Sequence, residues 1–340
     1  MSATIDRLLR YPRLLGTMSA AKSFHRQRPT PRVTDGQVQF RMRSAMDLDP
    51  RIGKWMSKRV FNDYPPEADT LAPPSASGLI DPAEIPAAVQ GVQENGYYVF
   101  ARVIDSSFVS SIRSFAESAP CQARGFDSPR GIYPRSAPQA GRYDFDERTA
   151  LQCAEVQEFV SDPAMVTIAR EYLGQPVLMD EMAFWWTTTQ RSDMANQNAQ
   201  LFHQDRNRLS FLKFFMYLTD VTPDSGPHVV LRGSHKSIPP SLRSDGRKDD
   251  AAVTSAGLGS DIREIEGPAG SLMVVDTIGL HKGKTPIARD RLAIEIQLST
   301  SLFGAPYEVP EFSPTQLLQE RFEQMPWVLQ RYSGSMPSQQ

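Results

Sequence analysis

The most regular pattern in the chain is an alternation of apolar and polar side chains over residues 291–299, RLAIEIQLS. A period of two is typical of a β-strand with one apolar and one polar face. We expect the aliphatic face to lie against helices, so that Arg291, Glu295 and Gln297 point to the opposite side of the sheet. Further strands are predicted from β-branched and aromatic runs at 97–103, 177–190, 262–267 and 271–276.

Helical signals gather between residues 81 and 173. A capping pattern at Asp81 and an Asn-Gly pair at 95–96 bound a first helix, and Asp105 or Ser106 begins a second that runs to about residue 119. Two more helices are predicted over 152–159 and 163–173. Residues 120–150 are rich in Arg, Gly and Pro, and we expect a long loop there.

Helices come first and short strands follow, which predicts an α+β fold with a mainly β core, helices covering one face of a sandwich or barrel. We expect one domain over residues 81–305. Residues 1–80 are predicted to be a basic, partly irregular arm and lead-in, in which Ile5, Leu8 and Leu9 form one face of a short helix limited by Pro12. Residues 306–340 are predicted to be a tail, helical near 317–322 and 327–331.

Composition narrows the class of protein. The 340 residues are 40% hydrophobic and 22% charged, with a net charge of -2, so no overall field attracts nucleic acid or an anionic membrane. No apolar run approaches the roughly 20 residues that span a bilayer. Two cysteines are too few for a disulfide framework, and we expect a soluble cytoplasmic protein, without a prediction of its oligomeric state.

Candidate metal ligands lie in the strand-rich half. His203 and Asp205 are two residues apart, so on an extended backbone both side chains reach the same side, and His281 ends a distant apolar run. Two His and one carboxylate suit Fe(II), with open positions for O₂ and a bidentate 2-oxo acid, and zinc in a hydrolase is the rival metal. His228 is the alternative third ligand, whereas His235 lies in a turn sequence and is expected to be structural.

Four motifs together resemble the phytanoyl-CoA dioxygenase family of Fe(II)/2-oxoglutarate oxygenases, over about residues 80–305. They are His203-x-Asp205, DSGPHVVLRGSHK at 224–236, GSLMVVDTIGLHKG at 270–283, and Arg291. The resemblance implies a double-stranded β-helix, or jelly-roll, with helices on one sheet.

The resemblance also implies roles for the motif residues. His203, Asp205 and His281 would bind iron, and Arg291 would pair with the distal carboxylate of 2-oxoglutarate. The implied reaction uses O₂ to oxidise a C–H bond of a small-molecule substrate, with 2-oxoglutarate converted to succinate and CO₂.

The chain departs from the family pattern at several positions. Many members have a Ser or Thr where this chain has Gly283, an apolar residue at His228 and a Pro at Arg232. Lys213 begins a strand-like run, and two interpretations are open: it reaches an anionic group of the co-substrate, or it extends from the strand end to solvent.

Other residues are candidates for the substrate wall. Glu295 and Gln297, with Tyr217 and Trp186, are expected to line the pocket, and the polar pair indicates a polar or cationic substrate. Two alternatives remain open: a metal-holding jelly-roll that binds a ligand without turnover, and an iron/2-oxoglutarate enzyme with a non-hydroxylating outcome. Halogenation is disfavoured, because it needs the position of Asp205 vacated for chloride.

Overall fold

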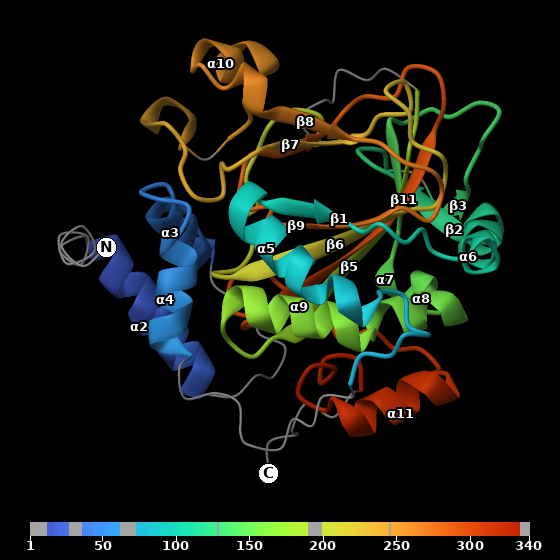
Figure 1. The fold of residues 1–340 in the computed structure, drawn as a ribbon, viewed down its shortest axis with the longest axis horizontal. Coiled ribbons are helices and arrows are strands. Elements are labelled where there is room, and N and C mark those ends of the chain that lie inside the picture. The colour runs from blue at the N-terminus through green and yellow to red at the C-terminus, as the bar shows by residue number, and fades with distance from the viewer. Residues whose placement is uncertain are drawn as a thin grey trace.

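Two antiparallel sheets face one another and form an open sandwich rather than a closed barrel (Figure 1). The computed structural model describes residues 12–26, 36–61, 73–127, 129–189, 199–244 and 246–333. The large sheet has the strand order β1 (Tyr97–Val99), β9 (Leu272–Val275), β6 (Phe211–Tyr217), β11 (Arg291–Ser299), β5 (Leu178–Thr187), β4 (Arg142–Phe145), β2 (Pro120–Ala123) and β3 (Gly131–Ile132). The small sheet has the order β10 (His281–Gly283), β7 (His228–Leu231) and β8 (Ile262–Ile265).

Strand β11 lies in the middle of the large sheet and pairs with β5 on one side and β6 on the other. Its aliphatic residues Leu292, Ile294 and Ile296 are buried in the core that the covering helices complete. The alternation predicted from the sequence is therefore confirmed, and the polar residues of β11 face the small sheet.

Helices cover the outer face of the large sheet, as predicted (Figure 1). They are η1 (Pro82–Glu84) with α5 (Ile85–Asn95), α6 (Ser106–Ser118), α7 (Glu147–Ala150), α8 (Ala154–Val160), α9 (Pro163–Leu173) and, from the C-terminal part, α11 (Gln316–Gln324). Asp105 accepts a hydrogen bond from the Ser107 amide at the start of α6, and Gly96 ends α5 with φ of 89°. These local signals account for the agreement between predicted and observed helices.

The lead-in is more regular than predicted. It contains α2 (Pro12–Arg26), α3 (Gly36–Met46) and α4 (Ile52–Val60), which pack on one another at one edge of the large sheet (Figure 1). Their apolar core also contains Phe211 of β6 and Phe303, which follows β11. These two aromatic side chains add to the few apolar residues that the helices themselves contribute. The predicted helix at Ile5–Leu9 lies outside the described residues.

Residues 120–150 are not a long loop, which corrects the sequence prediction. They contain β2, β3, β4 and α7, and β4 extends the large sheet by pairing with β5. Arg124 and Arg142 both hold the carboxylate of Asp144, at 2.8 and 2.7 Å. Strands of two to four residues give no periodic signal, and their pairing with neighbours defines them.

The rest of the chain contains short elements only. Between β7 and β8 the chain carries η2 (Pro240–Leu242), α10 (Asp250–Ser255) and η3 (Gly259–Asp261). Residues 327–331 form turns instead of the predicted helix. None of the described helices has the length and apolar character required to cross a membrane.

A buried ion pair fixes one end of the sandwich. Asp180 is the extra residue of a β-bulge opposite Gln297 and Leu298, and Arg208 holds it through two hydrogen bonds of 2.8 and 2.7 Å. Burial alone would favour the neutral acid, but Arg208 outweighs it and lowers the pKa of Asp180. Gln297 and Ser299 donate to the same carboxylate.

Arg208→Met is expected to lower the free energy of unfolding by about 3–5 kcal/mol, because it leaves a buried carboxylate without its counter-charge. Denaturant unfolding at neutral pH measures this cost. The control is Arg289→Met at an exposed position, which should change the value by less than about 0.5 kcal/mol. Equal stability of the two variants would contradict a structural role for the pair.

Candidate metal centre

Three side chains from two separate segments converge at one end of the sandwich. The backbones of His203 and His281 form an antiparallel bridge with reciprocal hydrogen bonds of 2.9 and 3.0 Å. The amide of Asp205 donates to the Thr277 carbonyl at 2.9 Å, which fixes the third residue against the same loop. Candidate ligand atoms of His203, Asp205 and His281 lie within 4.8 Å of one another, so the set can surround a single ion.

Both imidazoles are oriented by backbone carbonyls. Nδ1 of His203 lies 2.9 Å from the Leu201 oxygen, and Nδ1 of His281 lies 3.0 Å from the Gly279 oxygen. A proton on Nδ1 satisfies each contact and leaves the Nε2 lone pair directed at the carboxylate of Asp205, 3.7 and 3.6 Å away. Burial, and then the neighbouring His281, lower the pKa of His203 to about 3, so the neutral ligand form is favoured.

Lys213 is buried beside Asp205. Its ammonium lies 3.0 Å from Asp205 and 2.9 Å from Glu295, so two protein carboxylates already hold it. Burial favours the neutral acid of Asp205, but Lys213 and the two imidazoles outweigh it and keep its pKa far below the usual range. Lys213 therefore balances the charge of Asp205, and its contact with 2-oxoglutarate stays a prediction.

Arg291 is a buried cation without a counter-ion. It is 4% exposed, and no ion pair to a carboxylate is recorded for it within the described part of the chain. Its guanidinium donates to the Gly226 carbonyl and, at 3.3 Å, to the Thr187 hydroxyl, while its Nε has no partner. Burial lowers the pKa of Arg291, and the nearby Tyr217 offsets part of this effect. Arg289, two residues earlier, is exposed.

Gly283 lies beside Arg291, two residues after His281. A Cβ atom at this position would lie 3.4 Å from Nη2 of Arg291, tighter than most side-chain contacts. The missing hydroxyl noted in the sequence therefore leaves room for the guanidinium. Gly283 also pairs with His228 in the small sheet.

His228 lies outside the ligand cluster. Its ring packs 4.7 Å from Phe215 and 5.6 Å from His281, and its Nε2 is buried without a partner. The amide of His228 donates to the hydroxyl of Tyr217. His235 bonds the Gln93 carbonyl at 3.2 Å, in keeping with the predicted structural role.

The predicted wall residues lie on different faces. Glu295 and Gln297 are on the inner face, where Gln297 bonds Asp180 and Asn207. Tyr217 is also inside, but its hydroxyl donates to the Ile265 carbonyl and so joins the two sheets. Trp186 is on the outer face, stacked on Tyr133 at 4.6 Å within the helix-covered core, and its assignment to the wall is wrong.

The register of β5 against β11 decides which face of the sheet each tryptophan occupies. Trp186 pairs with Leu292 and shares its outward direction, whereas Trp185 pairs with Ala293 and lies in the inner apolar cluster. Adjacent residues of a strand point to opposite faces, so only one of the two tryptophans can reach the metal side.

A cavity of about 250 Å³ opens beside the cluster. His203 and Asp205 form part of its lining, and the lead-in helix α3 contributes another side through Gln39, Met42 and Arg43. This contribution was not predicted from the sequence, because α3 lies about 160 residues before His203 and Asp205 and carries no recognisable motif. The remaining lining residues are Gln204, Arg206, Asn207, Gly246, Arg247 and Ala305.

Two neutral imidazoles and one ionised carboxylate, with the buried Arg291 nearby, form a donor set that suits Fe(II). The sequence model described as phytanoyl-CoA dioxygenase matches residues 92–285, more than half of the chain, and the protein belongs to this family. It is thus a 2-oxoglutarate-dependent enzyme of the oxygenase type, with Fe(II) as metal and 2-oxoglutarate and O₂ as co-substrates. No curated protein matches the chain in sequence.

Solved structures resemble about two thirds of the chain. HygX from Streptomyces hygroscopicus, with nickel and 2-oxoglutarate bound, is 16% identical over 65% of this chain and 89% of its own, with a TM-score of 0.44. The epimerase SnoN, in complex with Fe³⁺, alpha ketoglutarate and nogalamycin RO, is 14% identical over 64% and 84%, with a TM-score of 0.46. The carbocyclase SnoK from nogalamycin biosynthesis is 16% identical over 63% and 83%, with a TM-score of 0.45. At these identities none of their reactions is transferred to this chain.

Lys213→Met is expected to destabilise the metal-free protein by about 3–5 kcal/mol, because Asp205 and Glu295 lose their shared counter-charge. The double variant Lys213→Met/Glu295→Gln should cost less than the sum of the single changes, since one of the two stranded charges is gone. Chemical denaturation in the presence of a chelator gives all three values.

The control for Lys213 is Lys284→Met, which removes a surface pair with Glu264 and should cost at most about 1 kcal/mol. Strictly additive costs in the Lys213/Glu295 cycle would show that the lysine does not balance both carboxylates.

Proposed function

We propose that the protein hydroxylates a polar small molecule in an Fe(II)- and 2-oxoglutarate-dependent reaction that releases succinate and CO₂. The observation that supports this most is Arg291, a buried guanidinium with a free Nε and no carboxylate partner recorded among the described residues, near the His/Asp/His cluster. A protein that only holds a metal binds no 2-oxo acid, and neither does a zinc hydrolase. Neither of them therefore needs a buried arginine to anchor one. A buried, uncompensated cation is costly unless an anion joins it.

In this proposal His203, Asp205 and His281 hold the iron. The two neutral imidazoles and one ionised carboxylate are the donor set that suits Fe(II), and the metal supplies activation of O₂ for oxidation of a C–H bond. The carbonyls at Leu201 and Gly279 fix the imidazole tautomers before metal binds, and Lys213 fixes the carboxylate. Because these groups are already arranged, little reorganisation accompanies loading.

Arg291 is proposed to pair with the distal carboxylate of 2-oxoglutarate. Gly226 and Thr187 occupy donors on its two terminal nitrogens, which restricts rotation of the guanidinium plane. The unpartnered Nε and the second hydrogens on the terminal nitrogens remain for a bidentate contact. Gly283 leaves the space that this contact requires.

The substrate is proposed to be polar, with oxygen acceptors. The cavity beside His203 and Asp205 is lined mainly by amide and guanidinium side chains, including Arg43 and Arg247. The inner-wall carboxylate of Glu295, which suggested a cationic substrate from sequence, is already balanced by Lys213. Its charge therefore does not favour a cation.

Hydroxylation is favoured over halogenation because Asp205 occupies the ligand position that chloride would need. A screen of polar small molecules, scored by succinate release, is expected to yield a substrate whose product gains one oxygen atom. Turnover under ¹⁸O₂ followed by mass spectrometry identifies the source of that atom. A product without added oxygen would assign the protein another oxidative outcome.

Single changes of His203, Asp205 or His281 to Ala are each expected to reduce iron-dependent succinate release to background. The fold should persist, because the apolar core does not contain these side chains. Succinate assays with circular dichroism as a control measure both properties. Full activity of His281→Ala together with loss of activity in His228→Ala would reassign the third ligand.

Arg291→Ala is expected to raise the apparent constant for 2-oxoglutarate by about 30-fold or more, as loss of a desolvated charge pair worth roughly 2–5 kcal/mol requires. Iron affinity should change little. The matched control, Arg289→Ala, removes an exposed arginine two residues away and should alter the constant by less than about threefold. The opposite ranking in a 2-oxoglutarate titration would overturn the assignment.

A further inference from the structure

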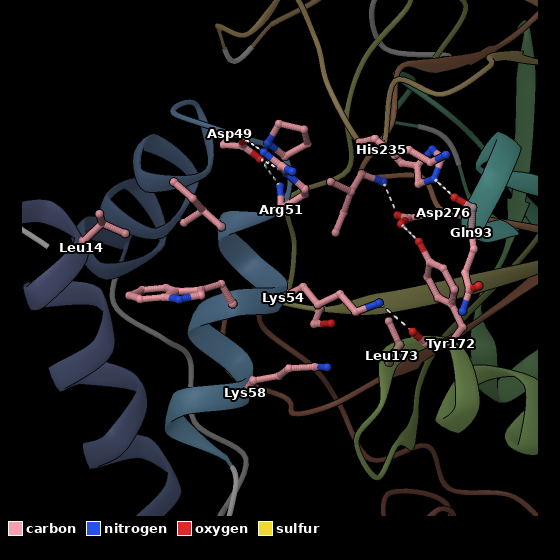
Figure 2. A pocket seen from close by; sticks show the side chains of 16 residues that line it. Leu14, Asp49, Arg51, Lys54, Lys58, Gln93, Tyr172, Leu173, His235 and Asp276 are labelled. Carbon is pink, nitrogen blue, oxygen red and sulfur yellow. Dashed lines mark hydrogen bonds and ion pairs between the residues drawn. The ribbon is translucent and has the colours of Figure 1, made fainter. Parts of the chain in front are cut away.

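A second and larger cavity lies between the lead-in helices and the large sheet (Figure 2). Its volume of about 750 Å³ is within the range of small-molecule sites, roughly 300–1,000 Å³. Helices α2 and α4 line one side, and the end of α9 with residues 276–278 lines the other. None of His203, Asp205, His281 or Arg291 lines this space, which we call the α4–α9 cavity.

Positive charge predominates in the α4–α9 cavity. Lys54 and Lys58 are one helical turn apart on α4, and both extend toward the end of α9 (Figure 2). Lys236 and Arg51 also line the cavity, against only two carboxylates, at Asp49 and Asp276.

Both carboxylates already have partners. Asp49 pairs with Arg51 at 2.8 Å. Asp276 accepts hydrogen bonds from the Tyr172 hydroxyl at 2.5 Å and the Ile278 amide at 3.1 Å. Within the described ranges, no ion pair is recorded for the three lysines of the cavity, so their charges are available to an anion.

Contacts with the C-terminal end of α9 explain the position of Lys54, but not the other features of the cavity. The ammonium of Lys54 donates to the Tyr172 carbonyl at 2.6 Å and lies 4.1 Å from the centre of the Tyr172 ring. These contacts use one of its three donors, and a cation at a helix C-terminus is ordinary. They do not account for the open volume or for Lys58 and Lys236. Burial lowers the pKa of Lys54, Asp276 partly offsets this effect, and the neighbouring charge of Lys58 adds to it.

The remaining lining is largely apolar. Its apolar side chains are Leu14, Pro50, Ile52, Trp55, Leu173 and Ile278, and Gln93, Tyr172, Ser210 and His235 complete it. Cations at one end and aliphatic and indole surface elsewhere fit a ligand with two matching parts. We propose that the α4–α9 cavity binds a small organic anion with an apolar body, its acid group placed at Lys54 and Lys58.

The site would be separate from the iron centre but adjoins it. The Thr277 carbonyl accepts from the Asp205 amide at 2.9 Å, and the Ile278 carbonyl accepts from the Gln204 side chain at 2.7 Å. Asp276 and Ile278 themselves line the α4–α9 cavity. The same short loop thus borders both spaces, and the proposal does not depend on the proposed hydroxylation.

The test uses the full chain and the fluorescent anion 8-anilinonaphthalene-1-sulfonate, with decanoate as a competitor. We expect one saturable site, displaced by decanoate but not by neutral decanamide or by 2-oxoglutarate, which lacks an apolar body. Lys54→Met and Lys58→Met should each weaken binding about tenfold, the effect of losing one charge-assisted contact. Lys54→Arg should stay within about threefold of the wild type, because the charge is kept.

The matched control is Lys284→Met, a lysine on the small sheet paired with Glu264, which should bind the probe as the wild type does. Lys58 is exposed, so its variant keeps the test decisive even where Lys54→Met fails to fold. Absence of saturable binding, displacement by 2-oxoglutarate, or unchanged affinity in Lys58→Met would overturn the proposal and leave these lysines as partners of the α9 C-terminus alone.

Discussion

The pairing of β11 with β5 and β6 decides which side chains face the metal cluster and which face the helices. Arg291 and Glu295 lie inside because Leu292, Ile294 and Ile296 fill the core under α5 and α9. A shift of one residue would exchange the two faces and expose the whole aliphatic row. The bulge at Asp180, closed by Arg208, keeps that register at the far end of the strand pair. The stability of the sheet and the position of the co-substrate anchor therefore depend on the same backbone contacts.

The proposed iron site depends on a second backbone constraint. The bridge between His203 and His281 and the bond from Asp205 to Thr277 assemble ligands from segments more than 70 residues apart. Lys213 then lets an ionised carboxylate persist in a partly buried space before any metal binds. The charges are matched around Asp205, whereas among the described residues no ion pair is recorded for Arg291 or for the lysines of the α4–α9 cavity. Each unmatched charge marks a place where an anion would stabilise the structure.

Local signals explain what could be predicted from sequence. Capping residues and left-handed glycines define α5, α6 and α9, and the period of two defines the faces of β11. The candidate ligand set could be proposed because His203-x-Asp205 and His281 form a specific combination, and the structure brings these three side chains together. Side-chain contacts that depend on the pairing of strands far apart in the sequence could not be predicted. The sequence does not reveal that Lys213 and Glu295 lie on adjacent strands one diagonal apart.

The same limitation explains the errors. Trp185 and Trp186 have identical chemistry, and only the register with β11 distinguishes the inner one. The strands within 120–150 are too short for periodicity, and the lead-in helices acquire their apolar partners from Phe211 and Phe303. The role of α3 at the mouth of the iron site depends on this packing, which no local pattern encodes.

The central claim is that one site holds Fe(II) and 2-oxoglutarate together. Anaerobic addition of Fe(II) and then 2-oxoglutarate, followed by visible absorption, tests it without knowledge of the substrate. A weak charge-transfer band that saturates at one equivalent of each, and that is lost in Asp205→Ala, is the predicted result. No band at saturating 2-oxoglutarate, or an unchanged band in Asp205→Ala, would contradict the assignment of this cluster as the iron centre.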